Sequence, residues 1–184
     1  PAGFFYSFFA ATVDIPGGWR AEGGVAWNRA TNCVTNQLQL AWRAMSPNGD
    51  EAVEILPGFN WQVQGTEVGM NPCPAAPFTS TRDFLQAVVQ QKRPGARVLQ
   101  YRDRPDLAPP NTTAPGSGAQ VRQEPGQILV AYAHDGREYR ETLSTTVTFS
   151  NLGGNVVAGT GMVFAHRAPS GGLDFALGDR IAAS

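Results

Sequence analysis

Serine and glycine motifs that support hydrolysis or phosphate binding occur only in incomplete form. A nucleophile elbow requires Gly-x-Ser-x-Gly between a strand and a helix, whereas Ser117 stands in Pro115-Gly116-Ser117-Gly118 within a proline-rich stretch. Gly159 and Gly161 form a Gly-x-Gly pair, but they fall inside an expected strand rather than at the turn that cradles a phosphate. Because a glycine inside a strand lets an aromatic ring or a helix approach closely, we expect both glycines to serve packing.

Histidines and paired acidic residues are the remaining candidates for catalysis or metal binding. His134 and His166 end two expected strands, where a side chain is usually solvated, and they lack the third ligand that a zinc site needs. Asp50-Glu51 and the pair Glu138 and Glu141 have the side chains that a glycosidase uses, but they fit a turn and the solvent face of a strand. The sequence therefore predicts no catalytic, metal or cofactor site, and a hydrolase that uses Asp or His is the third alternative.

The two cysteines, Cys33 and Cys73, both lie among turn-forming residues. An even number of loop cysteines indicates a disulfide, which would stabilise the fold by about 4 kcal/mol through closure of a loop of about 40 residues. Two unrelated free thiols are the alternative. The single lysine, Lys92, beside thirteen arginines is typical of a high-GC bacterial genome. Together these features predict a bacterial protein that is periplasmic or secreted.

Composition excludes several classes of protein. The chain has 184 residues, of which 42% are hydrophobic and 16% charged, with a net charge of -1. Such a chain has enough apolar surface to fold, and it lacks the basic excess of a general nucleic-acid binder. No run of about 18 apolar residues, the minimum for a spanning helix, occurs in it. The sequence thus predicts a globular protein without nucleic-acid binding and without a transmembrane segment.

Aromatic residues concentrate in the first third of the chain. Four tryptophans, Trp19, Trp27, Trp42 and Trp61, follow the aromatic run 4–9. Indole rings bury a large area and keep one hydrogen-bond donor, so they suit both a core and a binding surface. Packing under a helix is the simpler explanation for most of them. The residues we predict to contact a protein partner are Phe4, Phe5, Tyr6, Trp19 and Trp27.

Alternation of apolar residues and turn signals predicts the secondary structure. A Ser-Pro-Asn-Gly turn at 46–49 joins one hairpin, and Asp135-Gly136 has the residue types of a type I′ turn in another. Strands are expected at 8–15, 19–27, 37–46, 51–56, 61–64, 96–102, 127–134, 137–150 and 156–166, helices at 81–93 and 173–181, and an irregular proline-rich loop at 103–118. This order predicts one α+β domain over 1–184, with a mostly antiparallel sheet of about six to eight strands and two helices packed on it.

Three short motifs carry a resemblance to a known group. The segments 13–19 (VDIPGGW), 22–27 (EGGVAW) and 46–49 (SPNG) resemble the opening of bacterial exported proteins of unknown function. With the helix near 81–93 and the closing strands and helix, the order of elements is similar to the PsbP-like fold of extrinsic photosystem subunits and their bacterial relatives. The resemblance implies an accessory or assembly factor that docks on a larger complex, and it implies no catalytic residues.

These observations favour a non-catalytic, extracytoplasmic accessory domain that docks on a protein partner. The partner would be a membrane-anchored complex, electron-transfer or photosynthetic, of which this chain would be an extrinsic subunit. The alternative is a carrier of a small apolar ligand or lipid, with a pocket between the sheet and a helix.

Overall fold

The computed structural model describes residues 13–65, 73–108, 120–151 and 156–182. Its helices and strands follow one another as β1 (Arg20–Trp27), η1 (Val34–Asn36), β2 (Leu38–Met45), β3 (Ala52–Val63), β4 (Ala75–Ala76), α1 (Thr81–Lys92), β5 (Arg97–Asp103), η2 (Pro105–Leu107), β6 (Gln120–His134), β7 (Arg137–Asn151), β8 (Val157–Pro169) and α2 (Phe175–Ala182). Here η denotes a 3-10 helix.

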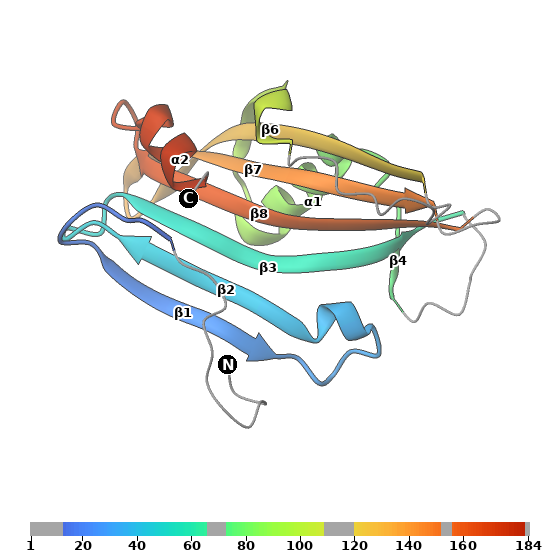
Figure 1. Cartoon of the computed structure of the whole chain (residues 1–184). Coiled ribbons are helices and arrows are strands. Elements are labelled where there is room, and N and C mark those ends of the chain that lie inside the picture. The colour runs from blue at the N-terminus through green and yellow to red at the C-terminus, as the bar shows by residue number, and fades with distance from the viewer. Residues whose placement is uncertain (1–12, 66–72, 109–119, 152–155, 183–184) are drawn as a thin grey trace.

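All eight strands belong to one sheet, with the order β1-β2-β3-β8-β7-β6-β5 and with β4 beside β3 (Figure 1). Every pairing is antiparallel except that of β4 with β3. The predicted α+β class, with a mostly antiparallel sheet and two helices, is therefore confirmed.

The β6–β7 hairpin has the turn that its sequence predicts. Asp135 and Gly136 both have positive φ, at 49° and 75°, as the two central residues of a type I′ turn require. The pairing then continues without a shift from His134 and Arg137 to Gln120 and Asn151. This hairpin and β8 form the three-strand meander expected from the sequence.

The strands expected in the first third of the chain differ from the structure in two places. The strand expected at 8–15 is absent from its described part, 13–15, because Val13 and Ile15 pack as irregular chain on a small core. The strands expected at 51–56 and 61–64 are one strand, β3, whose register shifts between Leu56 and Phe59 so that Pro57-Gly58 does not end it.

β6 begins earlier than expected, at Gln120, and so takes in a proline. Pro125 lies one residue beyond the last pair between β5 and β6, Asp103 with Gly126, so only β7 is its strand neighbour. A proline is tolerated where one side of a strand is unpaired. The loop expected at 103–118 therefore includes the end of β5 and η2 in its described part, and 109–119 lie outside the described residues.

Capping and apolar spacing explain α1. The Ser80 side chain accepts a hydrogen bond from the Asp83 backbone N–H at 3.2 Å, the usual N-cap arrangement. Phe84, Leu85 and Val89 are buried and pack α1 on β6 and β7. The helix ends just before Pro94-Gly95, as expected from the sequence.

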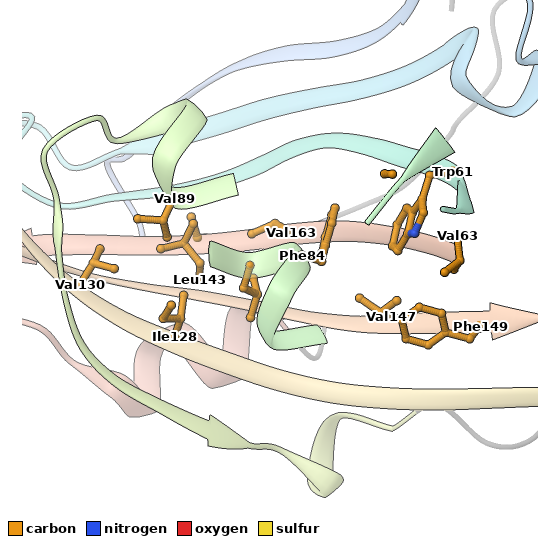
Figure 2. Close-up of a cluster of buried hydrophobic side chains, with 13 residues drawn as sticks. Trp61, Val63, Phe84, Val89, Ile128, Val130, Leu143, Val147, Phe149 and Val163 are labelled. Atoms are coloured by element: carbon orange, nitrogen blue, oxygen red, sulfur yellow. The ribbon is translucent and has the colours of Figure 1, made fainter. Parts of the chain in front are cut away.

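A main core lies between α1 and the sheet, and Trp61 lies toward one end of it, near Val63 and Phe149 (Figure 2). Trp61 is fully buried, stacks on Phe84 with ring centroids 5.1 Å apart, and donates from Nε1 to the Phe78 carbonyl oxygen at 3.1 Å. A Cβ at Gly159 would overlap the Trp61 ring, and one at Gly161 would lie 2.6 Å from Phe84. The two glycines serve packing, as predicted.

A smaller core occupies the opposite face of the sheet, under α2. Ile181 packs there with Ala44 and Val53, and Phe164 is among the half-buried residues around them. Phe164 and its neighbour Val163, which belongs to the main core, point to opposite faces of β8. The two helices therefore cover opposite faces of one sheet (Figure 1).

The contact between Gly159 and Trp61 yields a stability prediction. We expect Gly159→Ala to lower the free energy of unfolding by about 1–3 kcal/mol, because the new methyl group overlaps a ring that cannot move. Gly58→Ala is the matched control, since a Cβ there meets nothing closer than 3.8 Å. Urea denaturation of both variants measures the difference. Equal stabilities would show that Trp61 does not pack on Gly159.

Candidate functional site

A groove lies between α1 and the part of the sheet formed by β2 and β3. α1 packs on β6 and β7 and does not extend over this part of the same face. The groove encloses about 630 Å³, within the range of roughly 300–1,000 Å³ found for small-molecule sites. We call it the α1 groove and treat it as the candidate binding site.

The walls of the α1 groove are mainly apolar. Leu56 and Phe59 of β3 and Val163 of β8 line it from the sheet, and Phe84 and Val88 line it from the helix. Phe84 and Val163 also belong to the main core, so they are held rigidly from behind. The groove therefore offers an apolar surface that is already formed.

Polar residues line the edge of the groove on the sheet side, and they are bonded to one another. Asn36 donates from Nδ2 to the Asn60 carbonyl oxygen at 2.8 Å, and its Oδ1 accepts from the Asn60 backbone N–H at 2.7 Å. Gln39 donates from Nε2 to the Asn36 carbonyl oxygen at 2.7 Å. Thr31 Oγ1 accepts from the Cys33 backbone N–H at 3.1 Å. This edge is a fixed polar margin.

An ionic cluster anchors the C-terminal end of α1 to the sheet. Arg93 donates from Nε and from one terminal nitrogen to the two carboxylate oxygens of Glu141, each at 2.8 Å, and to Glu54 at 2.8 Å. Arg167 is directly across the strands from Glu141. Glu141 is fully buried, so the expectation that it faces solvent is wrong. The reason is Arg93, which comes from a helix distant in sequence and compensates its charge.

The same cluster shifts the pKa values of two side chains. Burial lowers the pKa of the Arg93 guanidinium, but the hydrogen bonds and charges of Glu141 and Glu54 outweigh it, so the pKa lies above its ordinary value. Burial raises the pKa of the Tyr132 phenol above 10.0, and the charge of Glu141 raises it further. Both groups stay protonated at neutral pH, as expected for structural roles.

His166 is buried in the other core and does not end a strand. β8 continues to Pro169, and α2 covers the imidazole so closely that a Cβ at Gly178 would lie 2.6 Å from Nδ1. His166 Nε2 is 2.8 Å from Glu51 Oε1. The prediction of a solvated strand-end histidine is therefore wrong, because α2 folds back over this residue. His134 is exposed, as expected.

A disulfide joins two segments that contribute lining residues to the groove. Cys33 and Cys73 are bonded, with Cα atoms 4.4 Å apart, as predicted. Thr31 and Pro74, close to these cysteines in sequence, both line the groove. The disulfide thus fixes the distance between two stretches of the groove margin that are about 40 residues apart in sequence.

Within the described part of the chain, the residues predicted to contact a partner do not form one surface. Trp19 is half-buried beside the α2 core, and Trp27 is at the far end of β1, opposite Leu38. Phe4, Phe5 and Tyr6 lie outside the described residues. The docking prediction stays a prediction.

Within residues 13–65, 73–108, 120–151 and 156–182, no three His, Cys, Asp or Glu side chains cluster so that they could hold a metal ion. In the same ranges, no helix has the length and apolar character needed to cross a membrane.

Comparison with protein-family models, with curated proteins and with solved structures gives no match. The resemblance to the PsbP-like fold therefore stays a prediction.

The Arg93 cluster yields a second stability prediction. We expect Arg93→Met to lower the free energy of unfolding by about 3–5 kcal/mol, because it leaves the buried Glu141 carboxylate without its cation. Arg97→Met on the edge strand β5 is the control, since Arg97 is exposed. Chemical denaturation measures both, and a loss at Arg93 no larger than at Arg97 would contradict the role of the cluster.

The disulfide yields a third prediction. Reduction of the native protein should lower the free energy of unfolding by about 4 kcal/mol, the value expected for closing a loop of about 40 residues. Thermal unfolding with and without dithiothreitol measures the effect. The double variant Cys33→Ser/Cys73→Ser should unfold at a lower temperature and show no response to the reductant. A wild-type protein that is equally insensitive would contradict the prediction.

Proposed function

We propose that this chain is a non-catalytic binding domain that holds a small apolar or amphipathic ligand in the α1 groove. The observation that supports the proposal best is the apolar wall of the groove, in which Leu56, Phe59 and Val88 are only partly buried. Sites for small ligands typically combine such walls with a few fixed polar groups at the margin.

Burial of apolar surface would supply the affinity. Each Å² of apolar area removed from water contributes roughly 25 cal/mol, and an apolar ligand would cover wall residues that are now partly exposed. Since Phe84 is packed on Trp61 from behind, the wall does not have to rearrange first. A preformed site loses less conformational entropy on binding than a site that must be ordered.

The disulfide supports an extracytoplasmic location, periplasmic or secreted, as part of this proposal. Disulfides form and persist in oxidising compartments and are rare in the cytosol of most organisms. The bond between Cys33 and Cys73 holds two parts of the groove margin together. In an oxidising compartment this disulfide would stay intact and would continue to stabilise the fold.

Docking on a protein partner is the second candidate function. It is supported by two apolar side chains, Val34 in η1 and Leu38 at the start of β2, which are 71% and 47% exposed. Leu38 is paired with Trp27 in the β1–β2 register. An extrinsic subunit of a membrane complex would bind its partner through such a surface. Neither Val34 nor Leu38 lines the α1 groove, so the two candidate functions use different residues.

Two tryptophan substitutions on α1 test the groove. Ala87 lines it and its neighbour Gln86 is exposed on another side of the helix. We expect Ala87→Trp to fill the groove and weaken binding of the fluorescent apolar probe N-phenyl-1-naphthylamine by about tenfold or more, equivalent to about 1.4 kcal/mol. Gln86→Trp should bind as the wild type does.

Fluorescence titration measures the affinities, and thermal unfolding shows that both variants fold. Native mass spectrometry of protein purified under mild conditions provides an independent readout of a retained small molecule. Absence of probe binding to the wild type, or equal binding by the two variants, would contradict the proposal.

A further inference from the structure

Among the described residues, Lys92 is the only charged one that lines the α1 groove. It is also the only lysine in the chain. It lies in the last turn of α1 and is exposed. Within the described part of the chain, no acidic side chain forms an ion pair with its ammonium group. The groove therefore has one positive charge at its helix side that no described carboxylate compensates.

Neighbouring charges do not alter this balance. Glu54 and Glu141 are the acidic groups near the end of α1, and both bind Arg93. Arg167 lies across from Glu141 and adds a second positive charge to the cluster. Two carboxylates thus face two guanidinium groups, and the charge of Lys92 is additional to them.

The two sides of the groove differ in the polar groups that they offer a ligand. On the sheet side, Asn36 and Gln39 already hydrogen-bond within the protein. On the helix side, the side chains of Gln91 and Lys92 have no hydrogen-bond partner among the described residues. Asn28 also lines the groove on the sheet side and uses only its Oδ1, as an acceptor, so neutral donors are available on both sides. What distinguishes the helix side is the charge of Lys92.

We propose that the ligand of the α1 groove is an anionic amphiphile, with its acidic head group at Lys92 and its apolar tail along Val88, Leu56 and Phe59. This inference rests on the proposed function and specifies the class of ligand. The C-terminal end of a helix by itself disfavours an anion, so binding of the head group depends on the charge of the Lys92 ammonium group.

The chemistry of lysine suits this arrangement. Its aliphatic stem packs along an apolar wall while the ammonium group stays at the water boundary. The head group would be only partly desolvated there, so the electrostatic contribution is moderate and sensitive to salt. The tail supplies most of the affinity, and Lys92 supplies the preference for an acid.

Paired ligands and paired variants test the inference on the full chain with its disulfide intact. The probes are dodecanoate and dodecanol, both below the concentrations at which they aggregate, and the affinities are measured by isothermal titration calorimetry. We expect the wild type to bind dodecanoate about threefold to tenfold more tightly than dodecanol, as for a partly exposed ion pair. High salt should reduce this preference.

Lys92→Met should bind both probes with the affinity that the wild type has for dodecanol, and Lys92→Arg should keep the preference for the acid. Arg180→Met is the matched control, since Arg180 is the basic residue in the last turn of α2, on the opposite face of the sheet. It removes the same charge from the protein and should leave the preference intact.

The outcomes separate the two proposals. Equal binding of both probes by the wild type, or an acid preference that survives in Lys92→Met, would overturn the assignment of an anionic ligand and leave an apolar site in place. Binding of neither probe would overturn the proposed function and this inference with it.

Discussion

The close approach of Trp61 to β8 is the constraint on which the position of α1 depends. A ring can lie flat on a strand only where that strand has no side chain in the way, and Gly159 and Gly161 provide this space for Trp61 and Phe84. Trp61 contacts Phe149 and Phe78 as well, so it joins β3, β7 and the segment before α1 around one ring. The helix packs over β6 and β7, and the groove remains beside it on the same face, along Leu56 and Phe59 of β3.

The other end of the helix is held by charge instead of by packing. Burying the Glu141 carboxylate would be very costly without a cation, and Arg93, the first residue after α1, donates two hydrogen bonds to it and one to Glu54. The contact of Phe84 with Trp61 near the start of α1 and the ion pairs of Arg93 just after its end hold both ends of the helix on the sheet. The width of the α1 groove is therefore set by interactions that lie behind its walls, and a ligand could enter without displacing them.

Residue types and spacing predicted the structural features that depend on residues close together in the sequence. They did not predict contacts between segments that are distant in the sequence. The Asp135-Gly136 turn, the helix start at Ser80 and the packing role of Gly159 follow from residue type and spacing, and the two cysteines were correctly paired. The burial of Glu141 could not be predicted, since its partner Arg93 lies 48 residues away. The burial of His166 depends on α2 folding back over β8, and its hydrogen-bond partner Glu51 is 115 residues away. The α1 groove was foreseen only as an alternative pocket between sheet and helix. Sequence shows that Phe84, Leu85, Val88 and Val89 are apolar, and it does not show that Leu85 and Val89 meet the sheet while Val88 lines an opening.

An open apolar groove must be reconciled with the stability of the fold around it. Exposed apolar walls favour collapse, because closing the groove would remove them from water, yet several contacts oppose this. The Cys33–Cys73 bond and the Asn36–Asn60 hydrogen bonds hold the outer margin, and α1 cannot move toward β2 without losing both the Trp61 stack and the Arg93 ion pairs. The disulfide, the polar margin and a helix held at both ends thus explain how the groove persists beside a packed core, and a preformed groove would lose little conformational entropy if it bound a ligand.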